Sequence, residues 1–252
     1  MALATIGLWL ILIAVLLLVF ENWIHRHLQG VWLLVFRHPE SATMIYALMM
    51  LPGVLLHETS HWLTATVLNV RTGHFSVVPE RLPDGTLRLG YVETEKPDLF
   101  REALIGIAPL LVGCAVVIFV GYTRLGVGPV GDALTNNDLL QAVQGMGAMT
   151  QAKDFWLWLY LIFAVSNSMV PSAADRRAWL PVAGMGVILV GVLVGLGLGP
   201  TLVEALGGLA AAGLRALAAA FTITVALDLA FIPLIWGIER LLMKLTGLKL
   251  DY

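Results

Sequence analysis

Two histidines and a glutamate lie within five consecutive residues, His57-Glu58-Thr59-Ser60-His61. On a helix, residues four apart lie on the same face, so the imidazoles of His57 and His61 can bind one metal ion. Glu58, between them, can then take a proton from a water on that ion. The surrounding stretch is apolar, which favours a functional site because ionisable groups are costly within a membrane. The alternative is that the two histidines only bridge neighbouring helices through hydrogen bonds.

A catalytic zinc ion usually has three protein ligands and a water. His57 and His61 supply two, and the other four histidines all lie outside the apolar stretches. Two carboxylates remain as candidates: Asp175, at the end of a later apolar stretch, and Asp228, inside the last one. Chain direction brings Asp175 to the side of the membrane that holds the two histidines. Asp228 lies roughly 15 Å from the end of its helix. It could therefore reach a depth in the membrane similar to that of the two histidines, and topology alone excludes neither candidate.

The composition is that of a membrane protein. Of the 252 residues, 59% are hydrophobic and only 13% are charged, whereas soluble domains carry about 25% charged residues. This excludes a water-soluble fold, and a net charge of −2 offers no basic surface for nucleic acid. The single cysteine, Cys114, excludes an intrachain disulfide. The many glycines and tryptophans suit helices that pack closely in lipid, with aromatic anchors at the interfaces.

The apolar stretches predict about six membrane-spanning helices, each near the roughly 20 residues that the hydrocarbon core requires. The predicted spans cover residues 2–22, 42–70, 103–123, 155–174, 178–203 and 216–238. The first has no basic leader and no small-residue cleavage site, which indicates a retained span. The run at 31–36 is too short to cross the membrane and is expected at its interface. We therefore expect an all-α polytopic protein in which residues 1–252 form one transmembrane domain.

Six spans place both termini on one side, and the positive charges indicate which side. Ten arginine and lysine residues fall on the side of the termini and five on the other, which favours cytoplasmic termini. After the second span, residues 72–95 alternate polar and apolar side chains around Leu82-Pro83-Asp84-Gly85, a strong turn signal. This pattern predicts a small membrane-associated β-hairpin. The short loops favour a prokaryotic inner membrane.

The chain resembles the site-2 protease family of intramembrane zinc metalloproteases. One shared element is the His57–His61 run. The second is the segment Asn167-Ser168-Met169-Val170-Pro171-Ser172-Ala173-Ala174-Asp175, in which an asparagine is followed by a proline and, eight residues on, by an aspartate. In addition, Gly106 and Ala108-Pro109 are similar to the small-residue and proline motif of the family's third span.

This resemblance implies one zinc ion per chain, with Asp175 as the third ligand beside His57 and His61. It implies that Glu58 is the general base and that Asn167 positions the substrate or stabilises the oxyanion. The implied activity is hydrolysis of a peptide bond within or near the transmembrane segment of another membrane protein. The expected partners are therefore a transmembrane protein substrate and the lipid bilayer, with no nucleic acid. The sequence does not indicate an oligomeric state.

Departures from the family pattern support a second hypothesis. Ser60 stands where the family often has glycine, and Arg176-Arg177 replace the glycines that commonly follow the aspartate. A membrane protein that is like a site-2 protease but does not cleave, and keeps its metal site for structure or partner binding, would tolerate both changes. A third hypothesis is a transporter or proton relay that uses Asp228 with the two histidines. It fits less well because the sequence shows no paired repeats.

Overall fold

A computed structural model describes residues 3–81 and 87–250, and these are mostly helical. Four helices are long and apolar enough to cross a membrane: α1 (Leu3–Phe36), α2 (Pro39–Val67), α3 (Leu99–Val120) with the π-helical turn η1 (Gly121–Leu125), and α8 (Gly199–Thr246). Two apolar helices are shorter: α6 (Phe155–Ser166) and α7 (Trp179–Gly195). The helical class of a membrane protein is thus confirmed. The number of spans stays a prediction.

Several helix boundaries differ from those expected. Residues 31–36 continue α1 without a break and form its last turns. The helix ends before Arg37, which adopts a φ of 58°, and α2 begins at Pro39. The fourth predicted span ends early, because α6 stops at Ser166 and Asn167 caps it. The weakly patterned residues 124–153 include two short helices, α4 (Gly128–Thr135) and α5 (Leu139–Met149).

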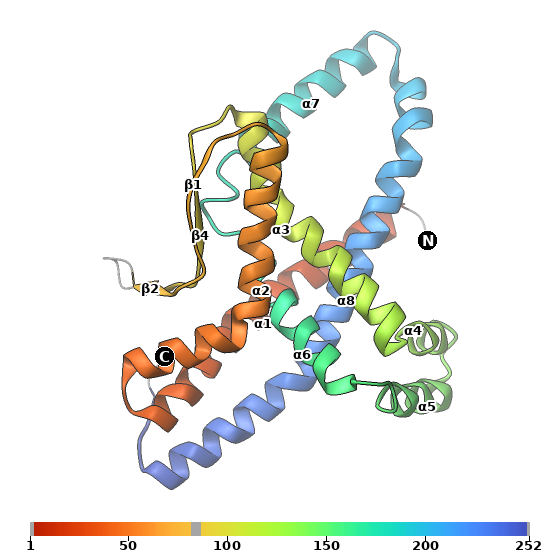
Figure 1. Cartoon of the computed structure of the whole chain (residues 1–252). Helices are drawn as coiled ribbons and strands as arrows, with labels where there is room; N and C mark the ends of the chain where they lie inside the picture. Colours follow the sequence, from red (N-terminus) through yellow and green to blue (C-terminus); the bar gives the residue numbers. More distant parts are fainter. Residues whose placement is uncertain (1–2, 82–86, 251–252) are drawn as a thin grey trace.

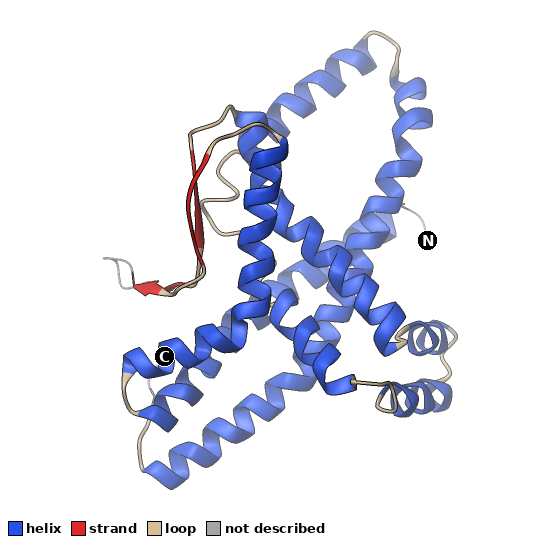
Figure 2. Ribbon diagram, viewed as in Figure 1, coloured by secondary structure: helices blue, strands red, loops and turns tan. Residues whose placement is uncertain are grey.

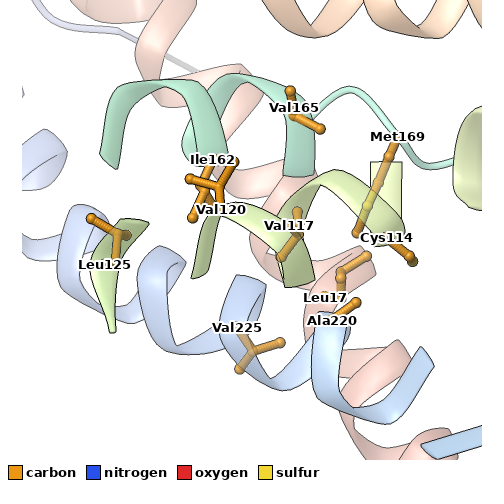
Figure 3. Close-up of a cluster of buried hydrophobic side chains, with 10 residues drawn as sticks. All are labelled: Leu17, Cys114, Val117, Val120, Leu125, Ile162, Val165, Met169, Ala220 and Val225. Carbon is orange, nitrogen blue, oxygen red and sulfur yellow. The ribbon is translucent and has the colours of Figure 1, made fainter. Parts of the chain in front are cut away.

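The core forms where α1, α3, α6 and α8 meet. Figure 3 shows ten buried side chains from these helices and the adjoining segments in one cluster. A second cluster joins α1 and α2 to α6 and α8 through residues such as Tyr46, Met50 and Phe163. The second cluster fixes α2, which carries the histidines, against α6, which leads to Asp175. In Figure 1 these helices cross near the centre of the molecule.

Helix α7 and the first part of α8 form an arm that stands apart from the crossing helices (Figures 1 and 2). Among the described residues of α7, none is buried. The predicted fifth span, 178–203, is divided here, because the chain turns at Gly197 with a φ of 82° before α8 begins. From Gly199 onward α8 is continuous, so the glycine-rich stretch 207–213 belongs to the same helix as the predicted sixth span.

Within the region of the predicted hairpin, the described residues form two pairs of antiparallel strands. Strand β1 (Thr72–Ser76) pairs with β4 (Tyr91–Thr94), with Phe75 opposite Val92 and a register irregularity between Thr72 and Phe75. Beyond them, β2 (Glu80–Arg81) pairs with β3 (Leu87–Arg88). The expected turn at Leu82–Gly85 lies outside the described residues. Figure 2 shows the strands beside α2, to which both β1 and β4 are packed.

Candidate metal centre

Three side chains from two distant parts of the chain converge on one point. His57 and His61 lie one turn apart on α2, and their Nε2 atoms are 3.1 Å from each other. Asp175 comes from the segment between α6 and α7, and its Oδ1 lies 3.2 Å from His61 Nε2. Its Oδ2 lies 3.8 Å from His57 Nε2. Together these residues form a group that could hold a metal ion.

Backbone carbonyls fix the orientation of both imidazoles. The Nδ1 of His57 lies 2.6 Å from the carbonyl oxygen of Ser168, and the Nδ1 of His61 lies 2.9 Å from that of Ile105. A carbonyl only accepts hydrogen bonds, so each Nδ1 must carry the proton and donate it. With Nδ1 as the donor, the neutral form of each imidazole has the lone pair of Nε2 directed toward Asp175. Such an outer hydrogen bond is usual for histidines that bind metals.

This donor set fits a zinc-like cation. Zinc–nitrogen distances of about 2.0–2.1 Å at a tetrahedral angle set two imidazole nitrogens roughly 3.3 Å apart, close to the 3.1 Å observed between His57 and His61. Two lone pairs and a carboxylate in such proximity repel one another unless a positive charge lies among them. A proton on one nitrogen would relieve one of the contacts, whereas a metal ion would relieve all of them.

Asp175 is positioned by its own turn. The N–H of Ser172 donates to Asp175 Oδ2 at 2.7 Å, and the N–H of Asp175 donates to Ser172 Oγ at 3.3 Å. This reciprocal pair has the arrangement of a capping box. The hydrogen bond that the Ser172 N–H donates to Oδ2 favours the ionised form of the Asp175 carboxyl. Asp175 is therefore a carboxylate that can act as a ligand.

Glycines allow the segment after α6 to approach the histidine helix closely. A Cβ added at Gly53 of α2 would lie 2.0 Å from the carbonyl oxygen of Ala164 and 2.6 Å from Ser168 Oγ. A Cβ added at Gly106 of α3 would lie 2.0 Å from the carbonyl oxygen of Asp175. Any larger residue at either position would push the segment away. These two glycines thus set the distance between Asp175 and the histidines.

Glu58 lies between the triad and the hairpin. It is buried, and it interacts electrostatically with His61, Asp175 and Arg88. A Cβ added at Gly90, between β3 and β4, would lie 2.9 Å from Glu58 Cγ and 3.0 Å from Val54 Cγ1. The hairpin backbone therefore passes directly over the face of α2 that carries Glu58. Glu58 therefore lies where the hairpin meets the charged groups of the site.

Asn167 and Asp228 contact each other. The Nδ2 of Asn167 donates to Asp228 Oδ1 at 3.1 Å and to the carbonyl oxygen of Phe163 at 3.1 Å. Both N–H groups of the amide are thus used, so stabilising an oxyanion would require the bond to Asp228 to break. Asp228 is not among the residues whose ligand atoms form the group that could hold a metal. The sequence did not identify these two residues as partners, because their contact depends on how α6 packs against α8.

Sequence reasoning also missed a set of buried polar contacts around α1. The Nδ1 of His27 lies 2.6 Å from Glu239 Oε2 of α8. The hydroxyl of Tyr46 on α2 makes a hydrogen bond with His25 Nδ1. These contacts explain how α1 continues through a polar stretch without ending. The available signal was the clustering of ionisable residues between two apolar runs.

Comparisons with models of protein families, with curated proteins and with solved structures give no match for this chain. The His-His-Asp group could hold a metal ion, and mixed nitrogen and oxygen ligands suit zinc among several divalent ions.

Proposed function

We propose that the chain is an intramembrane zinc metalloendopeptidase of the site-2 protease type. The observation that carries this proposal is the convergence of His57, His61 and Asp175, with the Nδ1 of each histidine bonded to a backbone carbonyl. A structural metal site is closed by a fourth protein ligand, whereas a catalytic site has three and leaves a position open. The group has three such residues among those described, and Glu58 lies beside it on the same helix.

The proposed roles follow from these positions. His57, His61 and Asp175 would hold the ion, and a bound zinc ion would supply the Lewis acidity that polarises a peptide carbonyl. Glu58 accepts a proton from the attacking water as the water oxygen bonds to the carbonyl carbon. It then donates this proton to the leaving amine as the C–N bond breaks. Asn167 and Asp228 maintain the end of α6, from which the segment bearing Asp175 departs.

The proposed substrate is a transmembrane segment of another protein. Its carbonyls are engaged in helical hydrogen bonds, so the segment must unwind before attack. The two-stranded sheet of β1 and β4 offers a surface for this step, because within the described part of the chain each of these strands has a neighbour on one side only. An unwound segment can add to such an edge through main-chain hydrogen bonds. Gly90 places this sheet directly beside Glu58.

The location is part of the proposal. The ten-to-five division of arginine and lysine residues supports cytoplasmic termini. His57 and His61 lie in the second half of α2, which leads into the hairpin. The site would accordingly lie toward the cytoplasmic side of a prokaryotic inner membrane. Labelling of single cysteines introduced at residues 71 and 153 in intact cells tests this orientation, since only one of them is then on the outer side.

The deciding experiment compares Glu58→Gln with Glu40→Gln in proteoliposomes that contain single-span membrane proteins. Glu40 is exposed at the start of the same helix and serves as a matched control. We expect cleavage by the wild type and by Glu40→Gln, and none by Glu58→Gln at unchanged metal content. Cleavage that persists in Glu58→Gln would contradict the assigned mechanism. A metal-loaded wild type that cleaves none of a broad panel would instead support the non-proteolytic hypothesis.

A further inference from the structure

Asp228 is the most deeply buried carboxyl group among the described residues, with no accessible surface. It lies on α8, and the one hydrogen bond identified for its carboxyl is with Asn167. A buried carboxyl in an apolar helix is costly and is retained where it performs a task. Asp228 lies outside the group that could hold a metal, so its observed contact with Asn167 is the starting point for its role.

The neighbour leads directly to the metal centre. Asn167 is the C-cap of α6 and is itself buried. The next residue is Ser168, whose carbonyl oxygen accepts the hydrogen bond from His57 Nδ1 at 2.6 Å. Asp228 is therefore connected to His57 through its hydrogen bond with the Asn167 side chain, the backbone from Asn167 to the Ser168 carbonyl, and the hydrogen bond that His57 donates to this carbonyl.

The surroundings leave this carbonyl little freedom. On one side, Gly53 of α2 is so close to Ser168 that a Cβ there would lie 2.6 Å from Ser168 Oγ. On the other, Met169 packs against Gly113 of α3, where a Cβ would lie 2.4 Å from Met169 Cβ. The Asn167–Asp228 bond ties the end of α6 to α8 and so opposes rotation of that end. In close-packed surroundings a small rotation here changes the direction of the Ser168 carbonyl.

We propose that Asp228 is a positioning residue: through Asn167 it fixes the Ser168 carbonyl that orients His57, and so sets the affinity of the His57-His61-Asp175 centre for its metal. This proposal rests on the proposed function in one respect: zinc is taken as the ion whose binding affinity is measured. Loss of an outer hydrogen bond of a metal ligand typically lowers metal affinity about 10–100-fold. We expect an effect in this range for Asp228→Leu, which removes the acceptor but retains bulk.

The first experiment measures zinc affinity of the full chain in nanodiscs, by competition with a chromophoric chelator. Asp228→Leu should bind zinc about 10–100-fold more weakly than the wild type, whereas Asp228→Asn, which can still accept from Asn167, should recover most of the loss. Thr224→Val is the matched control, because Thr224 is buried one turn earlier on α8 and its hydroxyl has no hydrogen-bond partner among the described residues. The control should bind as the wild type does. Equal affinity in wild type and Asp228→Leu would overturn the proposal.

A second readout needs no metal. The imidazole nitrogen resonances of His57 in ¹⁵N-histidine-labelled protein report which ring nitrogen carries the proton. In the metal-free wild type we expect Nδ1 to be protonated, and in Asp228→Leu a mixture of the two tautomers. An unchanged tautomer in Asp228→Leu would overturn the positioning role. If the wild type binds no metal at all, the proposed function fails, while the tautomer measurement still decides the role of Asp228.

Discussion

Ser172 and Asp175 are bonded to each other twice, through the N–H of Ser172 to the Asp175 carboxylate at 2.7 Å and through the N–H of Asp175 to Ser172 Oγ at 3.3 Å. The Asp175 carboxylate is thus held by its own backbone turn, and no contact with Arg176 or Arg177 is seen for it among the described residues. Arg176 instead donates from Nε to the carbonyl oxygen of Ser172. The arginines that replace the glycines expected after Asp175 therefore leave its carboxylate available to the histidines.

Replacing Ser172 with alanine should weaken metal binding moderately. The substitution removes the hydroxyl that accepts from the Asp175 N–H but leaves the N–H that donates to the carboxylate. Loss of a capping hydroxyl costs about 1 kcal/mol, so we expect affinity to fall roughly fivefold. Chelator competition measures this, with Ser41→Ala at the exposed start of α2 as the control. An affinity equal to that of the wild type would show that the hydroxyl plays no part.

The purified protein should contain about one zinc per chain, a stoichiometry expected of a single three-ligand centre. Asp175→Ala should lose most of this metal, because two imidazoles alone bind it weakly. Asp132→Ala, in the short helix α4 and exposed, should retain it. Mass spectrometry of detergent-purified protein gives the metal content directly. A wild type without zinc after supplementation, or an Asp175→Ala variant that keeps it, would exclude the centre as described.

Gly106→Ala should damage the centre from the opposite side. The added methyl group would lie 2.0 Å from the carbonyl oxygen of Asp175, and overpacking of this kind costs about 1–3 kcal/mol. We expect a lower melting temperature and weaker zinc binding. Gly191→Ala on α7 is the matched control, since nothing lies within 4 Å of its added methyl group. It should melt no lower than the wild type, and a similar loss in both variants would argue against a specific contact.

Gly90→Ala tests the role of the hairpin in cleavage independently of metal binding. Its methyl group would meet Glu58 Cγ at 2.9 Å and the carbonyl oxygen of Ser76 at 3.0 Å, so the hairpin must move away from α2. We expect substrate cleavage to fall at least tenfold with metal content unchanged. Gly131→Ala in α4, where the added group meets nothing within 4 Å, is the control. Full cleavage by Gly90→Ala would remove the hairpin from the proposed mechanism.

Part of the site could be predicted because its geometry is local. His57 and His61 share a face of α2 because they lie four residues apart, and the five-residue motif is sufficient to show it. The choice between Asp175 and Asp228 could not be made from helix directions alone. It depends on how closely α6 approaches α2, which Gly53 decides through a contact across more than a hundred residues of sequence. The resemblance to a protease family, and not the pattern of apolar residues, singled out Asp175.

The helix ends were predicted less well, for two physical reasons. Hydropathy continues past Ser166, so the fourth span was expected to reach residue 174, although Asn167 and Pro171 stop the helix first. Conversely, α1 was expected to end near its polar residues, yet it continues because partners on α2 and α8 satisfy them. The end of α6 depends on the backbone properties of individual residues, and the continuation of α1 depends on partners elsewhere in the chain. An average hydrophobicity reports neither.

The shortness of α6 has a consequence for the supply of water. Its 12 residues extend about 18 Å, less than the roughly 30 Å hydrocarbon core. In a bilayer the chain therefore becomes irregular before it reaches the far interface, and irregular backbone at that depth must be buried in protein or hydrated. The segment is exposed at Ser172, Ala173 and Ala174, so hydration reaches the neighbourhood of Asp175. The proposed peptide hydrolysis would consume one water molecule per bond broken, and this interrupted helix would be a route by which that water reaches the site within the membrane.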